Sequence, residues 1–392
     1  MRILFLSFYY PPDLCAGSFR AKSVVDALKR QDKFVEIDIL TTFPNRYKTF
    51  KKNSNEIEDD GLITIKRIEL PHHKSGMLDQ SRAFFQYFKK TLEFTKGKEY
   101  DLVFATSSRL MTAFLGAFIS GKIGKPLYLD IRDIFTDTMS NILSNKISYL
   151  INPILNYIEK VTFKKADHIN LVSEGFLKYF NEKYPLKKYS FYSNGIDELF
   201  LKKLTNKAPN KNNKKVILYA GNIGEGQGLN HFLPALAQKT NDKYHYRIIG
   251  DGGKRKSLEE NLRLLGVINV DIIDPIERAD LLIEYQNADI LFLHLNNYDA
   301  FKKVLPSKIF EFAAIGKPIL AGVSGYSAEF LKKYVENSSV FEPCNVNKAT
   351  DSLESLDLRH TNRDSFIEMF SRSKIMNNMA TSILSLAITN RP

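Results

Sequence analysis

The sequence predicts an α/β protein made of two doubly wound domains, each with a parallel sheet between layers of helices. Three observations lead to this fold class. The 392-residue chain opens with an apolar strand, a loop, an amphipathic helix and a second strand. The same alternation of strands and helices then continues to residue 321. A polar segment at 202–215 interrupts it and separates two series of similar rhythm.

The first series begins at residues 2–8, an apolar run that ends before Pro11 and Pro12. A buried parallel strand has this composition. Small and apolar residues recur at helical spacing from Ser18, and a second strand is expected at 34–40. We expect further strands near 63–68, 101–105, 126–131, 168–172 and 190–192, and helices near 78–97, 109–122, 142–165 and 174–183. The polar stretch 44–61 is typical of an irregular, mobile loop.

The second series begins with a strand at 215–220, a glycine-rich turn at 221–228 and a helix at 229–239. We expect strands at 245–249, 269–273, 289–293 and 318–321, a turn at 250–253, a helix through Leu258, Leu262 and Leu265, and helices at 277–287 and 307–315. Ligands of such sheets gather at the carboxyl ends of the strands, and a cleft between two such domains is a preferred ligand site.

The predicted domain boundaries follow from these two series. Residues 1–195 form the first domain and residues 196–371 the second, with the polar linker near the start of the second series. The tail 362–388 has a helical pattern, and we expect a C-terminal helix at about 372–392 to pack back onto the first domain.

Composition and charge exclude several classes of protein. Hydrophobic residues make up 44% of the chain, including 28 Phe, so a disordered chain is excluded. Residues 1–195 hold 30 basic and 21 acidic residues, against 26 and 23 in the remainder, out of a net charge of +12. A basic first half indicates an anionic partner, which is a phosphorylated ligand, a membrane surface or a nucleic acid.

The cysteines and the lengths of the apolar runs indicate in which cell compartment we expect the protein. Cys15 and Cys344 are the two cysteines and lie far apart in sequence, which excludes a disulfide framework or a zinc cluster and fits a reducing compartment. The longest apolar stretch, 110–119, is well short of the roughly 20 residues that span a bilayer. We therefore expect a cytosolic protein with membrane contact only at its surface.

Two glycine-containing turns are candidate phosphate sites. The loop P-P-D-L-C-A-G-S-F-R puts Gly17 at a strand-to-helix turn, where free backbone N–H groups attract anions, and Arg20 adds a cation. Its alternative interpretation is a helix cap formed by Ser18. The turn Y-A-G-N-I-G-E-G-Q-G-L follows a strand and lets the backbone approach a pyrophosphate, but fits neither the P-loop nor the dinucleotide fingerprint. Its alternative is a tight turn with no ligand.

Two charged segments are candidates for polar chemistry. In V-L-P-S-K-I-F-E-F, Glu311 is a carboxylate among apolar residues and could bind sugar hydroxyls, while Lys308 shares its face; a surface ion pair is the alternative. In Y-L-D-I-R-D, residues Asp130, Arg132 and Asp133 stand at the end of a strand. Carboxylates there could bind an acceptor hydroxyl or act as a base, with a structural salt bridge to Arg132 as the alternative.

Two further features keep both a functional and a structural interpretation. His294 ends a strand on the ligand side, with simple packing as its alternative. The helix near 78–97 carries Phe84, Phe85, Phe88 and several lysines. Such a helix could lie on an anionic membrane, or it could be a core helix with a solvated lysine face.

The order of the motifs resembles a known family. The segment S-N-G-I-D-E-L-F at 193–200 is similar to the domain junction of family-four retaining glycosyltransferases, which have the GT-B fold. I-I-G-D-G-G, N-A-D-I-L-F-L and P-S-K-I-F-E-F-A-A-I-G-K-P-I follow in the family's order. The opening Y-Y-P-P-D-L-C-A-G-S-F-R resembles a bacterial branch that includes N-acetylfucosamine transferases of O-antigen and capsule assembly. The resemblance spans nearly the whole chain.

The resemblance implies a metal-independent transferase that keeps the anomeric configuration. A nucleotide sugar, expected to be UDP-linked, would bind mainly the second domain, and an undecaprenyl-diphosphate-linked glycan mainly the first, at the inner face of the plasma membrane. No cofactor is implied. The implied catalytic residues are Asp133, Glu311 and Lys308; the donor-binding residues Gly17, Arg20, Gly221, Asn222, Gln227, Gly250, Ser307 and Lys303; and the acceptor-binding residues Arg132 and Asp130.

The chain departs from the family at three positions. Asn222 and Gln227 stand where the family commonly has an Arg and a Lys, and Lys303 stands at the first of the paired glutamates. We expect Lys303, Lys308 or Arg20 to supply the missing phosphate charge. Two other functions stay open, an epimerase of the same fold and a non-catalytic partner subunit. A nucleic-acid binder is supported by charge alone.

Overall fold

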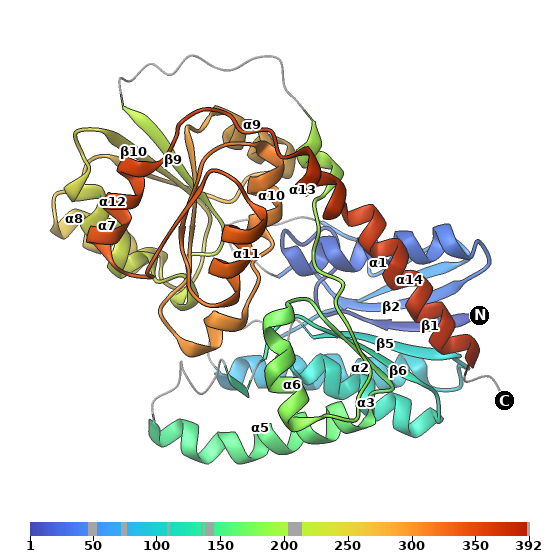
Figure 1. Cartoon of the computed structure of the whole chain (residues 1–392). Helices are drawn as coiled ribbons and strands as arrows, with labels where there is room; N and C mark the ends of the chain where they lie inside the picture. Colours follow the sequence, from blue (N-terminus) through green and yellow to red (C-terminus); the bar gives the residue numbers. More distant parts are fainter. Residues whose placement is uncertain are drawn as a thin grey trace. The chain divides into compact units, whose positions relative to one another are not determined.

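The computed structural model describes residues 1–45, 53–71, 77–107, 110–134, 136–137, 145–202 and 214–389. The chain forms two compact units, which are coloured by sequence in Figure 1. Unit 1 comprises Met1–Asn194 with Ser373–Pro392, and unit 2 comprises Gly195–Arg372. Each unit contains its own sheet covered by helices, so the predicted α/β class with two doubly wound domains is confirmed.

The sheet of unit 1 has the strand order β3-β4-β2-β1-β5-β6-β7-β8. Its strands are β1 (Arg2–Leu6), β2 (Glu36–Thr42), β3 (Ile57–Asp59), β4 (Ile63–Ile68), β5 (Leu102–Ser107), β6 (Leu127–Ile131), β7 (His168–Leu171) and β8 (Tyr189–Ser190). Neighbours are parallel except β3 and β4. The central strands are apolar along their length because helices cover both faces of the sheet.

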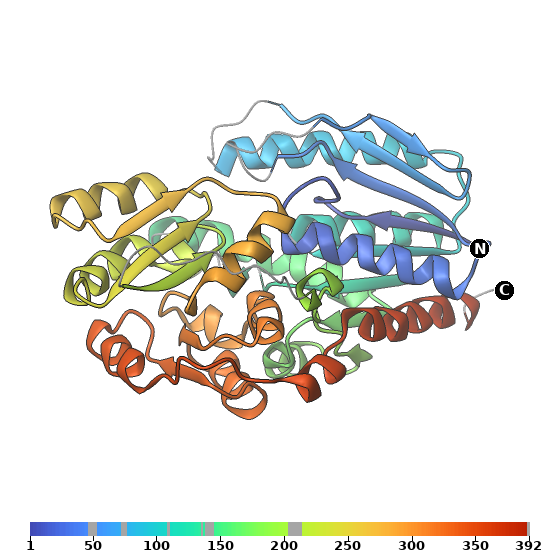
Figure 2. The ribbon, with the colours of Figure 1, turned by 90° about the horizontal axis from the view of Figure 1, so that it is seen from above.

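The helices of unit 1 divide between the two faces. They are α1 (Ala16–Gln31), α2 (Met77–Thr95), α3 (Leu110–Ile123), α5 (Asn145–Lys165), α6 (Leu177–Lys183) and α14 (Arg372–Thr389). Helices α1 and α14 share one apolar core with Ile3, Phe5 and Phe104 of the sheet. Helix α3 lies against the alternate residues Leu6 and Ala105, and Figure 1 shows α2, α3 and α5 together on that opposite face. Figure 2 shows the same chain from above, with α1 and α14 on the near side of this sheet.

The expectation of a loop over 44–61 is wrong for its last part. Residues Ile57–Asp59 form β3, which pairs antiparallel with β4. The buried Arg67 of β4 organises this edge, because its guanidinium donates to the carbonyls of Asn55 (2.9 Å) and Pro11 (2.9 Å) and pairs with Glu58. This pairing depends on residues distant in sequence, so local composition did not indicate it. Residues 46–52 lie outside the described part of the chain.

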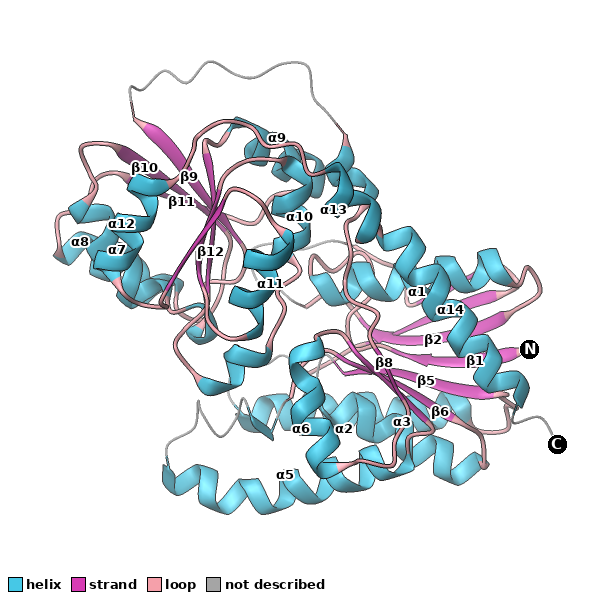
Figure 3. Cartoon of the chain, in the orientation of Figure 1, coloured by secondary structure: helices cyan, strands magenta, loops and turns pink. Residues whose placement is uncertain are grey.

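Unit 2 has a fully parallel sheet in the order β11-β10-β9-β12-β13-β14 (Figure 3). Its strands are β9 (Lys215–Ala220), β10 (Tyr244–Ile249), β11 (Val270–Ile273), β12 (Ile290–His294), β13 (Ile319–Gly322) and β14 (Ser338–Phe341). Its helices are α7 (Leu229–Lys239), α8 (Arg255–Leu264), α9 (Arg278–Asn287), α10 (Lys308–Ile315), α11 (Tyr326–Tyr334), α12 (Val346–Ser355) and α13 (Asp364–Met369). All strands predicted between 215 and 321 are present, whereas β14 was not predicted.

The two chain segments that connect the units run side by side at the edge of unit 2. Ile196 N donates to Phe370 O (2.7 Å), and Arg372 N donates to Ile196 O (3.0 Å). The carboxylate of Asp197 binds the guanidinium groups of Arg278 and Arg372, each at 2.7 Å. Burial alone would raise the pKa of Asp197, but the two arginines outweigh it and hold that pKa below its ordinary value. The segment at 193–200 therefore also holds the two connecting segments together through Ile196 and Asp197.

None of the helices in the described part of the chain is both long and apolar enough to cross a membrane.

Candidate functional site

Two glycine-containing turns interlock at the carboxyl end of the second sheet. Gly221 N donates to Ile249 O and Ile223 N donates to Asp251 O, both at 2.9 Å. A Cβ atom at Gly250 would lie 1.9 Å from Gly221 O, so at this position the backbone of one turn approaches the other too closely for a side chain. The predicted donor-binding residues Gly221 and Gly250 thus belong to one continuous backbone surface.

Asn222 and Gln227 stand where the family that the sequence resembles commonly has an Arg and a Lys, and here they bind each other. Asn222 Nδ2 donates to Gln227 Oε1 at 2.8 Å, across the turn that contains both residues. Tyr219 Oη donates to Asn222 O at 2.7 Å and fixes the start of this turn. The side chains of Asn222 and Gln227 thus stabilise the turn and supply no positive charge. A phosphate bound here would need its countercharge from elsewhere.

His294 at the end of β12 has a structural role. Its Nδ1–H donates to Gln227 O (2.6 Å), and its Nε2 accepts from Cys344 N (3.0 Å). The ring is fully buried and stacks on Phe232 at a centroid distance of 4.3 Å. Burial lowers the pKa of His294 to about 4, with the bond to Gln227 opposing it. The neutral ring therefore holds the glycine-rich turn, which supports the packing interpretation of this residue.

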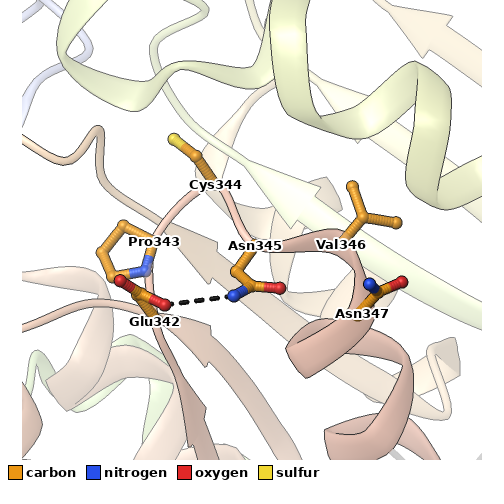
Figure 4. A pocket seen from close by; sticks show the side chains of 6 residues that line it. All are labelled: Glu342, Pro343, Cys344, Asn345, Val346 and Asn347. Carbon is orange, nitrogen blue, oxygen red and sulfur yellow. Dashed lines mark hydrogen bonds between the residues drawn. The ribbon is translucent and has the colours of Figure 1, made fainter.

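A surface pocket lies in the loop between β14 and α12 (Figure 4). It is lined by Glu342, Pro343, Cys344, Asn345, Val346 and Asn347. The Cys344 thiol donates to Asn296 Oδ1 at 3.4 Å, and Asn296 N donates to Gly226 O at 2.8 Å, so the pocket adjoins the glycine-rich turn. Figure 4 shows Asn345 donating to Glu342. These lining residues include no Lys, Arg or His.

The first turn of α10 carries a linked group of three polar side chains. Lys308 Nζ binds Glu311 Oε2 (2.8 Å) and Tyr285 Oη (2.6 Å), and Tyr285 Oη donates to the same Glu311 oxygen at 3.0 Å. Glu311 is only 6% exposed, which makes a simple surface ion pair a poor description. Burial first, and Glu311 second, raise the pKa of Tyr285 well above its ordinary value, so it stays a hydrogen-bond donor. Glu311 Oε1 has no partner among the described residues.

Two other predicted donor-binding residues flank this helix. Ser307 is the N-cap residue of α10, and its side chain makes no capping hydrogen bond. Lys303 ends a short 3₁₀ turn (Asp299–Lys303) and is partly exposed. Helix α10 and the two glycine-containing turns all follow strands of one parallel sheet. Unit 2 thus collects six of the predicted donor-binding residues and two of the predicted catalytic residues, Lys308 and Glu311.

Arg20 and Asp130 of unit 1 form a buried ion pair. Arg20 Nε and Nη2 each bind one carboxylate oxygen of Asp130 at 2.8 Å, and the guanidinium also donates to Ser193 O and Tyr192 O, both at 2.7 Å. Burial would raise the pKa of Asp130, but Arg20 outweighs it and the pKa lies below its ordinary value. Both side chains are at most 2% exposed.

This ion pair corrects the predicted roles of both residues. Arg20 was expected to bind donor phosphates and Asp130 an acceptor, whereas each is enclosed and satisfied by the other. The alternative salt bridge was expected with Arg132, and its partner is Arg20 instead. Removing one member of such a pair leaves a buried charge and costs about 3–5 kcal/mol of stability.

Arg132 and Gly17 meet at the start of α1. A Cβ atom at Gly17 would lie 2.1 Å from Arg132 Nη1, so the guanidinium rests directly on the glycine backbone. Arg132 Nε is buried and has no hydrogen-bond partner among the described residues, and no ion pair to this guanidinium occurs there. The N-terminus of α1 adds backbone N–H groups without a side-chain cap. Cation and helix terminus together favour a bound anion.

The neighbouring Asp133 is exposed, and its backbone follows β6 directly. It therefore lies at the carboxyl end of the first sheet, next to Arg132. Thr136, two residues beyond the buried Ile134, binds Glu159 of α5 and so ties this loop to the helix layer. Asp133 thus stands on a loop anchored at both ends, in a position open to solvent.

Sequence reasoning missed two features of these sites. The role of Tyr285 was not recognised, because a tyrosine in an amphipathic helix has the pattern of a core residue. The contact of Arg132 with Gly17 joins residues more than 100 positions apart, and only the adjacency of β1, β5 and β6 brings them together. Among the described residues, no three His, Cys, Asp or Glu side chains converge as a metal-ion site.

A family model matches part of this chain, and the matched part lies within unit 2. Residues 202–369 match the family described as "Glycosyl transferases group 1". A putative colanic acid biosynthesis glycosyl transferase, WcaI, of Escherichia coli (strain K12) is 31% identical over 124 residues. That alignment covers 32% of this chain and 30% of the relative, so the chain matches less than a third of the relative's length.

Solved structures share the fold over the whole chain. Sucrose-phosphate synthase from Thermosynechococcus elongatus superimposes with a TM-score of 0.71 at 12% identity, covering 99% of this chain and 97% of that one. HepE of Anabaena, solved in complex with UDP-glucose, gives a TM-score of 0.67 at 18% identity and covers 98% and 99% of the two chains. The chain therefore has the two-domain GT-B fold, and its second unit matches the glycosyl transferases group 1 over almost all of its length.

Proposed function

We propose that this chain is a retaining, metal-independent glycosyltransferase of bacterial surface-polysaccharide synthesis. It moves a sugar from a nucleotide sugar, UDP-linked and of the N-acetylfucosamine type, to an undecaprenyl-diphosphate-linked glycan of an O-antigen or capsule. It acts as a peripheral protein on the inner face of the plasma membrane. The family match of unit 2, the name of the colanic acid relative and the UDP-glucose complex of HepE support this proposal.

The observation that carries the proposal is the arrangement around Glu311. Its Oε2 is held by Lys308 and Tyr285, and its Oε1 is without a partner in the described chain. This second oxygen can accept hydrogen bonds from a ligand, and vicinal hydroxyls of a ribose are suitable donors. Lys308 and Tyr285 fix the position of the Glu311 carboxylate through Oε2, so its orientation is set before the nucleotide binds.

The countercharge for the diphosphate comes in this proposal from Arg132. Asn222 and Gln227 carry no charge, Arg20 is enclosed with Asp130, and Lys308 is occupied by Glu311 and Tyr285. Arg132 has no ion pair among the described residues and lies against the backbone of Gly17 at a helix N-terminus. Cations and oriented N–H groups stabilise charge that develops on a leaving diphosphate without a metal ion.

The chemical step then needs no nucleophile from the protein. The acceptor hydroxyl attacks the anomeric carbon from the face that the diphosphate leaves, and a donor phosphate oxygen takes its proton. Asp133, exposed at the carboxyl end of the first sheet, is placed in this scheme to orient the acceptor hydroxyl. Its role is positional, because the configuration is retained without a covalent intermediate.

Calorimetric titration and thermal shift with UDP, GDP, TDP and their sugars test this function. UDP and a UDP-sugar should bind without metal and raise the melting temperature by mass action. At a ligand concentration of 100 times Kd, the free energy of unfolding should increase by about 2.7 kcal/mol. Glu311→Gln should weaken binding about 10- to 100-fold, since it removes a charge-assisted hydrogen bond. Glu284→Gln is the matched control, because it breaks a carboxylate pair with Arg247 elsewhere in unit 2.

The same titration examines the assigned cation. Arg132→Gln should lower UDP-sugar affinity by about 10-fold or more, while Arg30→Gln, on the exposed side of α1, should leave it unchanged. Binding of no nucleotide by the wild type would overturn the proposed function. Full binding by both Glu311→Gln and Arg132→Gln would mean that the nucleotide uses another surface.

A further inference from the structure

The helix layer formed by α2, α3 and α5 presents large apolar side chains to solvent. They are Phe85 (69% exposed), Phe118 (44%), Ile154 (61%), Tyr157 (69%) and Val161 (38%). The three helices cover the same face of the first sheet, opposite to α1 and α14 (Figure 1). Helices α2 and α3 touch through Phe88 and Phe118, whose ring centroids are 5.4 Å apart. Isolated exposed apolar residues are ordinary, but a group on one layer indicates a contact surface.

Three of these residues form a stripe along α5. Ile154, Tyr157 and Val161 are spaced by three and four residues and therefore share one side of the helix. The opposite side is buried through Thr162 and Phe163. Helix α5 is thus apolar on both sides, one facing the sheet and one facing solvent. A helix that served only the core of unit 1 would carry polar residues along its outer side.

The charges on the outer side of α5 are all positive in its described side chains, residues 151–165. Lys160 and Lys164 are exposed beside the apolar stripe. The one acidic residue, Glu159, is buried and accepts hydrogen bonds from Tyr179 Oη (2.6 Å) and Tyr184 Oη (3.2 Å). The acid is thus withdrawn from the surface by its partners inside unit 1. The solvent-exposed side of α5 is therefore an apolar stripe flanked by lysines.

Helix α2 extends the positive charge but contributes less apolar surface. Arg82, Lys89 and Lys90 are exposed, and Glu93 pairs with Lys90 at 2.9 Å. Phe84 and Tyr87 are buried in the core. Most aromatic residues of α2 therefore serve packing, and the sequence pattern that indicated a membrane helix at 78–97 is better satisfied by α5.

We propose that the α5 face, defined as Ile154, Tyr157, Lys160, Val161 and Lys164, docks on an anionic lipid bilayer. Apolar side chains enter the boundary between headgroups and acyl chains, while the lysines reach the anionic headgroups on their flexible stems. Tyrosine favours the same boundary because its ring is apolar and its hydroxyl polar. The inference rests on the proposed function for its biological meaning, since a lipid-linked acceptor is reached at a membrane surface.

Vesicle co-sedimentation of the full chain tests this surface without donor or acceptor. Wild type should bind vesicles of phosphatidylcholine with 30% phosphatidylglycerol more strongly than vesicles of phosphatidylcholine alone. Lys160→Gln with Lys164→Gln should weaken binding to the anionic vesicles about 30-fold, since each lysine near such a surface contributes about 1 kcal/mol. Ile154→Ser with Tyr157→Ser should weaken binding to a similar degree by removing the inserted side chains.

The control is a matched pair on another part of unit 1. Leu186 and Lys188 are both exposed, with Leu186 at 96%, so Leu186→Ser with Lys188→Gln removes the same kinds of group outside the α5 face. This control should bind vesicles like the wild type. Equal vesicle binding by the α5 variants would overturn the proposal, as would a wild type that does not distinguish the two lipids. A dimer that the α5 variants dissociate would assign the face to a second copy instead.

UDP titration of the same variants separates this inference from the proposed function. The α5 variants should keep the nucleotide affinity of the wild type, which also demonstrates that they are folded. Vesicle binding that is lost in the α5 variants supports the docking surface even if no nucleotide binds. Nucleotide binding with no vesicle preference would retain the transferase proposal and remove the surface.

Discussion

At the scale of single residues, His294 makes the stability of unit 2 depend on pH. Its folded-state pKa is about 4, against 6.5 for the unperturbed group, because burial disfavours the imidazolium. Between pH 6.5 and 4 the unfolded chain binds a proton that the folded chain does not, so stability falls as the pH falls through this window. From pH 7.5 to pH 5.0 the loss attributable to His294 should be about 2 kcal/mol.

Urea unfolding at the two pH values, read from the transition of unit 2, measures this loss. His294→Gln has no titrating ring and should lose about 2 kcal/mol less than the wild type over the same interval. The variant comparison is needed because His168 in unit 1 also has a pKa lowered to about 4 by burial. Equal losses in both proteins would mean that the pKa of His294 is the same in the folded and the unfolded chain.

At the scale of an element, the two interlocked turns of unit 2 depend on Gly250. Gly250→Ala should destabilise unit 2 by about 2–3 kcal/mol, because its Cβ would meet Gly221 O at 1.9 Å and the backbone must shift. Nucleotide affinity should fall as well, since the displaced turn carries Asn222 and Gln227. Thermal unfolding together with UDP titration measures both effects.

Gly253→Ala is the control within the same turn. A Cβ there would meet no heavy atom within 4 Å, so its effect on stability should stay within about 0.5 kcal/mol. Similar behaviour of the two variants would contradict the view that close approach of the backbone, rather than glycine content in general, sets the shape of this edge.

At the scale of the whole molecule, the last helix completes the first unit. Met376, Met379, Ala380 and Ile383 of α14 are fully buried in the core shared with α1 and the first sheet. Ile383→Ala should therefore destabilise unit 1 by about 2–5 kcal/mol. Ile388→Ala, on the same helix but 59% exposed, should change stability by less than about 0.5 kcal/mol.

Denaturant unfolding with a signal specific to each unit measures this difference. A chain that ends after Arg372 should lose the cooperative transition of unit 1, because several large apolar side chains leave its core together. Retention of that transition in the shortened chain would mean that the first sheet folds without α14.

Local patterns were sufficient for the elements of both sheets. The runs at 2–6, 102–107 and 217–220 form strands. Helices cover both faces of a parallel sheet, so consecutive residues of such a strand are apolar and the pattern is visible in the sequence. The glycines at 221–228 and 250–253 likewise indicated tight turns after strands. Patterns failed at β3 and β14, which are short and partly polar, and which exist because a neighbouring strand offers them hydrogen bonds.

Candidate residues could be found in the sequence, but their partners could not. Asp130, Arg132 and Arg20 were all visible as charged residues near strand ends. Which arginine binds Asp130 depends on how α1, β6 and the segment before residue 194 come together. That pairing encloses Arg20 and leaves Arg132 against Gly17. In the same way Glu311 and Lys308 are neighbours on one helix turn, whereas Tyr285 reaches them from α9.

The order of strands, helices and turns, and hence the fold class, was thus contained in short stretches of sequence, because burial and turn geometry act over a few residues. Which charged side chains pair with each other, and which residues of α5 are exposed, is decided only in the folded chain. Electrostatic pairing and solvent exposure depend on distances between residues far apart in sequence, and these distances are fixed only when the elements pack.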